Sequence, residues 1–197
     1  MDYFPDVGHT LRDLFGKYWH QHGEEAQFGL PITEEFREVS PTNGETYLVQ
    51  YFQRARFELH PEYAGTQYEV LLGLLGHNQA PEQGRNEVYF RRTPDAHQSQ
   101  GLYFPNTGHN LDPKFVDYWN THGGLPVFGE PISEPFQETN RVDGTMYLVQ
   151  YFERNRFELH SEPPAPPEVL LGLMGVEELC ARYSVKCETL DPVATLP

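Results

Sequence analysis

Apolar and polar positions near the start of the chain follow the period of an α-helix. Four large apolar side chains fall at i, i+4, i+7 and i+8, on one face of such a helix: Leu11, Phe15, Tyr18 and Trp19. Gly23 follows them, and glycine commonly ends a helix because it adopts a left-handed conformation without strain. The pattern therefore predicts an amphipathic helix that stops at about this glycine, with Trp19 in the core.

The residues that follow predict a fixed loop and then short strands. Glycine and proline exclude regular helix from residues 28–34, while the apolar residues between them favour a buried loop. An Asn-Gly pair at 43–44 predicts a β-hairpin, whose second strand covers residues 47–52. A third strand is expected over residues 56–60, and a last apolar stretch, 70–76, closes the segment.

The strand over residues 47–52 leaves open which of its faces is buried. Side chains alternate between the two faces of a strand, so Leu48, Gln50 and Phe52 share one face. If that face is core, Gln50 lies inside and bonds to loop backbone, and Tyr47 and Tyr51 face outward with the intervening valine. The opposite assignment fits the pattern nearly as well.

The same order of elements returns one hundred residues later. Residues 3–60 align with residues 103–160 without a gap, and 31 of 58 positions are identical, which indicates a tandem duplication. We predict an α+β fold of two homologous, pseudo-symmetric repeats, each a helix packed on a small antiparallel hairpin sheet. The expected organisation is a first unit, a linker, a second unit and a C-terminal tail: residues 1–76, 77–100, 101–175 and 176–197.

Two shorter elements are expected outside the repeated parts. In the linker, Val88-Tyr89-Phe90 could add an edge strand, and in the tail residues 177–183 could form a short helix. Cys180 and Cys187 also lie in the tail. In an oxidising compartment two cysteines this close favour a local disulfide, although two ordinary thiols fit the sequence too.

Charge and hydropathy narrow the choice of partners. The chain of 197 residues has 14 basic against 29 acidic residues, a formal net charge of −15, which repels phosphate backbones and anionic lipid. The sequence contains no run of about 18 apolar residues of the kind that spans a bilayer. We therefore expect neither nucleic-acid binding nor membrane insertion. No apolar N-terminal region typical of a signal peptide is present, but such a peptide could already have been removed.

Taken together, these motifs resemble the LGFP-repeat family of bacterial cell-envelope proteins. The resemblance is carried by the Phe-Gly-x-Pro-Ile-Thr/Ser-Glu segments, the turn glycines and the aromatic strands: residues 28–34, 128–134, Gly44, Gly144, 47–52 and 147–152. It covers most of residues 11–76 and 111–175. The chain departs from the family in having phenylalanine in place of the motif's leucine, and Arg-x-Arg in place of a glycine-rich turn. The resemblance implies an extracellular, envelope-associated module, often attached to a hydrolase or transferase.

One set of residues is compatible with a metal-dependent hydrolase. Glu58 and His60 stand at i and i+2 and so point to the same face of a strand. If His9 folded back onto that strand, the three side chains could hold zinc with an open position. The copy repeats the strand pair: Glu158 and His160. A simpler explanation is an edge strand that carries solvated polar residues. The hydrolase is therefore the weaker alternative.

Other routes to catalysis have little support in the sequence. Glu34 and Glu38, with their copies Glu134 and Glu138, could form a glycosidase carboxylate pair, but solvated charges explain them as well. The chain has no Gly-x-Ser-x-Gly elbow, and neither cysteine lies in the repeated parts. We therefore predict a protein that is not an enzyme and needs no cofactor and no metal.

Side chains on the repeated strands are better suited to binding sugars. Flat aromatic rings contact the apolar face of a pyranose over a large area, and carboxylates and guanidinium groups bind its hydroxyls. The candidate ligand-binding residues form matched sets: Tyr47, Tyr51, Arg54, Arg56 and Glu58, and Tyr147, Tyr151, Arg154, Arg156 and Glu158. The arginines could instead pair with nearby glutamates in a solvated arrangement.

The predicted function is a non-catalytic extracellular module that attaches a secreted or surface protein to cell-wall polysaccharide or glycan. Two sites on one chain would gain avidity on a repetitive polymer, because the second contact is intramolecular. The alternative is a protein–protein interaction or structural module of the cell envelope, with another envelope protein as its partner. That alternative predicts binding that responds strongly to salt.

Overall fold

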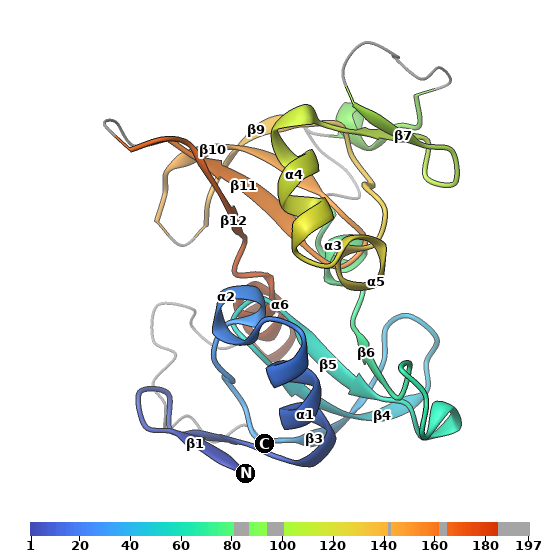
Figure 1. Cartoon of the computed structure of the whole chain (residues 1–197), viewed down its shortest axis with the longest axis vertical. Coiled ribbons are helices and arrows are strands. Elements are labelled where there is room, and N and C mark those ends of the chain that lie inside the picture. The colour runs from blue at the N-terminus through green and yellow to red at the C-terminus, as the bar shows by residue number, and fades with distance from the viewer. Residues whose placement is uncertain (81–86, 94–100, 142, 162–164, 185–197) are drawn as a thin grey trace. The chain divides into compact units, whose positions relative to one another are not determined.

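The protein has a mixed α+β fold that divides into two compact units (Figure 1). The computed structural model describes residues 1–80, 87–93, 101–141, 143–161 and 165–184. These residues form six α-helices, two 3-10 helices and four small antiparallel sheets. Unit 1 combines residues 1–75 with the segment that starts at Leu173, and unit 2 comprises residues 76–172. Each unit is described separately below.

Unit 1 begins with a two-stranded sheet and two helices, and then forms a four-stranded antiparallel sheet in the order β3-β4-β5-β6. Its elements are β1 (Asp2–Phe4), β2 (His9–Leu11), α1 (Asp13–Gln21), α2 (Glu24–Phe28), β3 (Phe36–Val39), β4 (Thr46–Tyr51), β5 (Arg56–Leu59), the 3-10 helix η1 (Pro61–Tyr63), β6 (Val70–Leu72) and α6 (Met174–Tyr183). The helix predicted from residue 11 is confirmed as α1, and the predicted tail helix is confirmed as the second half of α6.

Unit 2 has a four-stranded antiparallel sheet in the order β12-β11-β10-β9 and a separate two-stranded sheet. Its elements are α3 (Leu75–Gln79, which begins at the boundary with unit 1), the 3-10 helix η2 (Glu87–Phe90), β7 (Leu102–Phe104), β8 (His109–Leu111), α4 (Pro113–Thr121), α5 (Gly124–Phe128), β9 (Phe136–Thr139), β10 (Met146–Tyr151), β11 (Arg156–His160) and β12 (Glu168–Leu171). The edge strand considered for residues 88–90 is wrong, because these residues form η2.

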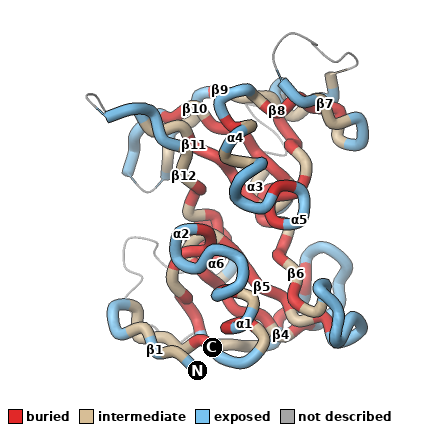
Figure 2. The backbone as a smooth tube through the Cα atoms, viewed as in Figure 1, coloured by how far each residue is buried: buried red, intermediate tan, exposed pale blue. Residues whose placement is uncertain are grey.

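Aromatic rings fill the core between the helices and the four-stranded sheet of each unit. In unit 1, Phe57 of β5 packs against Phe15, Tyr18 and Phe28 with ring centroids 4.9–5.9 Å apart and near-perpendicular planes. Unit 2 shows the same arrangement around Phe157. Such edge-to-face contacts add to the free energy gained from burying the rings. Figure 2 shows the central strands of both sheets buried.

The tryptophan of the predicted helix makes the same polar contact in both units. The Trp19 Nε1–H group donates to the Gly29 carbonyl at 3.1 Å, and Trp119 donates to Gly129 at 3.1 Å. Trp19 is buried, whereas Trp119 is half-buried. Gly29 ends α2 with φ of 75°, a left-handed conformation that glycine adopts without strain. The indole therefore fixes the start of the predicted loop.

Helix α6 lies on the sheet of unit 1 and does not form a separate tail. Its apolar residues Val176, Leu179 and Cys180 are buried in one cluster with Val49 and Tyr51 of β4. The N-terminus of α6 also fits closely against the β4–β5 turn, since a Cβ at Gly175 would stand 1.8 Å from the Phe52 carbonyl oxygen. The expected boundary at residue 176 therefore differs from the structure, because periodicity within one repeat does not reveal a cover from the far end of the chain.

Both faces of β4 are consequently covered, contrary to the expectation that one lies open. On the first face, Gln50 is fully buried, and its side-chain amide donates to the carbonyls of Thr10 and Thr33 at 2.7 and 2.8 Å. This confirms the predicted bond to loop backbone. On the second face, Tyr47 and Tyr51 are also buried. In unit 2, Gln150 and Tyr151 are buried in the same manner.

Cys180 is disulfide-bonded. Its expected partner, Cys187, lies outside the described residues. Among the helices that the structure describes, none is long and apolar enough to cross a membrane.

Candidate functional site

The predicted ligand-binding residues come together in each unit, but mostly in the interior. Arg54 and Arg154 are partly exposed. The other eight are buried: Tyr47, Tyr51, Arg56, Glu58, Tyr147, Tyr151, Arg156 and Glu158. The face on which these residues were expected to meet a glycan is therefore not an open surface, and the alternative in which Tyr51 faces outward is wrong.

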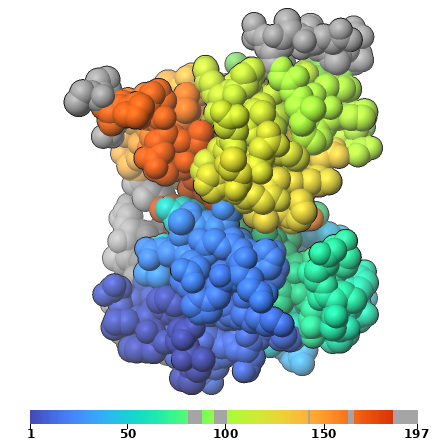
Figure 3. All heavy atoms as spheres, viewed as in Figure 1, coloured from blue at the N-terminus to red at the C-terminus, as the bar shows by residue number. Residues whose placement is uncertain are grey.

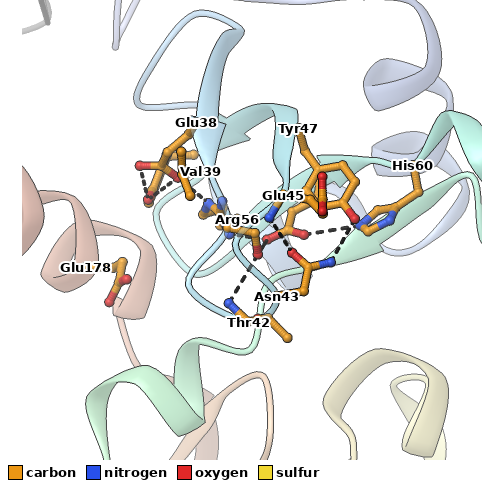
Figure 4. A network of polar contacts seen from close by, with 12 residues as sticks. Glu38, Val39, Thr42, Asn43, Glu45, Tyr47, Arg56, His60 and Glu178 are labelled. Carbon is orange, nitrogen blue, oxygen red and sulfur yellow. Dashed lines mark hydrogen bonds and ion pairs between the residues drawn. The ribbon is translucent and has the colours of Figure 1, made fainter.

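In unit 1 the buried residues form a network around Arg56 (Figure 4). The Arg56 side chain is 1% exposed and forms ion pairs with Glu58 and, from Nε at 2.8 Å, with Glu38 of β3. The Tyr51 hydroxyl donates to Glu38 at 3.1 Å. Burial disfavours the charge on Arg56, but the facing acidic groups, Glu58 foremost, outweigh burial and raise its pKa. From the sequence, the arginines could have paired with glutamates in a solvated arrangement. For Arg56 the ion pairs do form, but they are buried.

Helix α6 adds a second cation to this network. Arg182 Nε lies 3.1 Å from Glu38 Oε1, and its Nη2 donates to the Val39 carbonyl at 2.5 Å. The Tyr183 hydroxyl donates to the same carboxylate. Burial and then this contact raise the pKa of Tyr183 to about 12. Ion pairs and hydrogen bonds, as well as apolar packing, therefore hold α6 on the sheet of unit 1.

Unit 2 builds the same centre under a different cover. Arg156 Nη2 lies 2.6 Å from Glu158 Oε1, and the Tyr151 hydroxyl donates to Glu138 at 2.9 Å. Over this face lies η2, whose Tyr89 ring stacks on Phe136 at 4.8 Å. The Phe90 ring, also from η2, lies edge-on to Tyr151 at 5.3 Å. Rings from η2 thus occupy the place that α6 takes in unit 1.

The arrangement required by the hydrolase alternative is not formed. His9 lies beside Glu34, with 3.5 Å between Nδ1 and Oε1, while His60 lies between Glu58 and Glu62 at 3.2 and 2.8 Å. No group of three potential metal ligands is found among the residues that the structure describes. Of the two carboxylates considered as a glycosidase pair, Glu34 accepts hydrogen bonds from Thr10, whereas Glu38 belongs to the buried network around Arg56.

One of the predicted residues does reach a surface groove. This hairpin groove, of about 500 Å³, is lined by residues of β3, β4, β5 and η1: Arg37, Glu45, Thr46, Tyr47, Leu48, Leu59, Pro61 and Glu62. The Tyr47 hydroxyl accepts from Asn43 Nδ2 at 2.8 Å and donates to Glu62 at 3.4 Å. Polar groups and the edge of an aromatic ring therefore share its wall.

A row of three neighbouring rings leads from the hairpin groove to an exposed tyrosine. The Tyr47 ring lies 4.0 Å from that of His60, and the His60 ring lies 6.0 Å from that of Tyr63, nearly parallel to it. Tyr63 is 46% exposed. The sequence analysis missed Tyr63 because it is not repeated in unit 2. The feature that could have pointed to Tyr63 is its lack of a counterpart in unit 2.

No protein-family model, curated protein or solved structure matches this chain.

Proposed function

We propose that the chain is a non-catalytic, extracellular binding module that attaches a secreted or surface protein to cell-wall polysaccharide or glycan through the hairpin groove of unit 1. The observation that carries this proposal is the row of rings Tyr47–His60–Tyr63, which ends in an exposed tyrosine beside a polar groove. Aromatic surface next to hydrogen-bonding groups is what a pyranose ring requires.

The polar groups of the groove suit hydroxyl-rich ligands. The exposed carboxylates of Glu45 and Glu62 accept hydrogen bonds, and the exposed guanidinium of Arg37 donates them. Glu62 is already positioned by His60 and Tyr47, so less side-chain freedom is lost on binding.

We infer further that the two units descend from one repeat and are pseudo-symmetric. The duplicated sequence and the matching element order support this inference. The resemblance to LGFP-repeat proteins supports an envelope location and a partner in the cell wall. Neither unit needs a cofactor for this role.

The test is retention on insoluble cell-wall preparations and polysaccharides at low and high salt, with and without EDTA. We expect the full chain to be retained at high salt and with EDTA, because contacts to sugar hydroxyls and ring faces are weakly screened. The double variant Arg37→Ala/Glu62→Ala, at two exposed positions, should lose retention. Glu25→Ala/Lys114→Ala removes one charge of each sign from exposed helical positions and should behave as the original chain.

Three results contradict this proposal. No retention on any polysaccharide would reject glycan binding and favour the protein-interaction alternative. Retention that disappears with EDTA alone would indicate a metal-dependent contact. Equal retention of both double variants would place the glycan outside the hairpin groove.

A further inference from the structure

A second groove of unit 1 lies next to the same surface loop. This helix groove, of about 380 Å³, is bounded on one side by α1 and on the other by the chain before and at the start of β6: Leu14, Lys17, Tyr18, Gln21, His22, Gly65, Thr66, Gln67, Glu69 and Val70. Figure 3 shows the atoms of α1 and of the 60s loop on one face of unit 1. Nothing in the buried network uses these residues.

The helix groove combines an aromatic pair with fixed polar groups. The Tyr18 and His22 rings are stacked at 4.0 Å, and His22 Nδ1 lies 2.7 Å from the Tyr18 carbonyl oxygen. Because a carbonyl oxygen only accepts, Nδ1 is the donor in this contact. Glu69 is held by the Gly65 N–H group at 2.9 Å. Lys17 and Gln67 are exposed and supply donors.

Residues 61–69 form a shared wall between the two grooves. Pro61 and Glu62 line the hairpin groove, and residues 65–67 and 69 line the helix groove. Gly65 comes three positions after Glu62, so their Cα atoms are at most roughly 11 Å apart. The loop is also tightly turned, since the Thr66 N–H group donates to the Tyr63 carbonyl at 3.0 Å. The two grooves therefore lie within a few sugar lengths of each other.

Two exposed tyrosines belong to this loop. Tyr63 is 46% and Tyr68 is 55% exposed, and every residue from 61 to 68 is exposed (Figure 2). Large aromatic side chains are more often buried than this. A pair of them on one short loop, between two polar grooves, is typical of a binding surface.

We propose that the hairpin groove, the 61–69 loop and the helix groove form one extended site for a neutral glycan several sugars long. This inference rests on the proposed function and adds the charge and length of the ligand. In the helix groove the charges of Lys17 and Glu69 cancel. The hairpin groove is lined by Arg37 together with two carboxylates, those of Glu45 and Glu62. With a net charge of −15 over the whole chain, a polyanion is repelled and a neutral chain is not.

The extended site belongs to unit 1 and not to its copy. In place of the loop sequence PEYAGTQYE at residues 61–69, unit 2 has SEPPAPPE at residues 161–168. Both tyrosines are lost, and so are the glycine and the glutamine of the helix groove. The Tyr118–His122 stack remains at 4.0 Å, so the ring pair alone is not what distinguishes the units.

The test uses titration calorimetry of the full chain with oligosaccharides of two and six sugars from chitin, cellulose and mannan, and with hexamers of polygalacturonate as the anionic probe. We expect a hexamer of at least one neutral series to bind about tenfold or more tightly than its dimer, because the second groove adds an intramolecular contact. The variant Lys17→Ala/Gln67→Ala should bind that hexamer no better than the dimer. The matched change on α4, Asp117→Ala/Thr121→Ala, should leave the preference for length intact.

The results that overturn the extended site differ from those that overturn the proposed function. Retention on insoluble polysaccharide without a preference for hexamers would keep a glycan-binding module but reject the second groove. The same holds if the Lys17→Ala/Gln67→Ala variant, shown to be folded by circular dichroism, keeps its preference. Tighter binding of the anionic hexamer than of every neutral one would reject the neutral ligand.

Discussion

The two units share a buried centre and differ in what surrounds it. In both, an arginine of the third strand of the four-stranded sheet is enclosed by glutamates of neighbouring positions: Arg56 with Glu38 and Glu58, and Arg156 with Glu138 and Glu158. The cover of this centre is α6 in unit 1 and η2 in unit 2. The surface loop before the last strand also differs in sequence. Repeated residues thus specify the frame, and unrepeated residues specify the surface.

The shared centre gives the largest expected effect. Replacing the buried arginine by methionine, in Arg56→Met or Arg156→Met, leaves carboxylates buried without their main partner. We expect each change to lower the free energy of unfolding by about 3–5 kcal/mol, measured by urea unfolding at neutral pH. A loss below about 1 kcal/mol in one unit only would show that the two centres are not equivalent.

The cover of unit 1 gives a smaller effect that is confined to that unit. Leu179 of α6 is 1% exposed, so Leu179→Ala should cost about 2–4 kcal/mol. Leu125→Ala in α5 of unit 2 makes the same chemical change at a side chain that is 48% exposed, and should cost under about 0.5 kcal/mol. Amide hydrogen exchange should show faster exchange in β4 and unchanged protection in β10. Equal loss of protection in both strands would contradict the assignment of α6 to unit 1.

Part of this architecture could be predicted from the sequence and part could not. The period of the apolar residues predicts α1, and the Asn-Gly turn predicts the hairpin, because both signals are local. The inward amide of Gln50 follows from alternation along the strand. The cover over Tyr51 could not be found in this way, since it comes from α6, which lies more than one hundred residues away, and the residues of α6 beyond Gly175 have no counterpart in the first repeat.

The candidate site could also be predicted only in part from the sequence. The predicted ligand-binding residues were those repeated in both units. Most of them are identical because they form a buried network of ion pairs in each unit. Tyr63 and Tyr68 occur once and were passed over for that reason. In a duplicated chain, a search for function gains by examining where the copies differ.

The smallest expected effect is a difference between the two units in how much stability each loses at acid pH. Burial raises the pKa of Glu34 and of Glu134, but hydrogen bonds from Thr10, and from His109 and Asn110, outweigh burial and lower both values below 4.5. A lowered carboxyl pKa stabilises the fold above the unfolded value, and this contribution is lost as pH falls below about 4.5.

The Glu134 side chain is 24% exposed and that of Glu34 is 52% exposed, so solvent screens Glu34 more strongly. We expect Glu134→Gln to cost more than Glu34→Gln at pH 7, each under about 1 kcal/mol, and both costs to be smaller at pH 3 than at pH 7. Urea midpoints at the two pH values measure this difference. A cost that grows on acidification would reverse the sign and contradict the assignment.

The most direct test of the account is retention at high salt of the full chain and of a Tyr63→Ala/Tyr68→Ala variant on insoluble neutral polysaccharide. Both tyrosines are exposed, so the variant should unfold at the same urea concentration as the original chain. The account predicts that the original chain is retained and that the variant passes through. Retention of the folded variant at the level of the original chain would contradict the claim that the unrepeated loop of unit 1 carries the function.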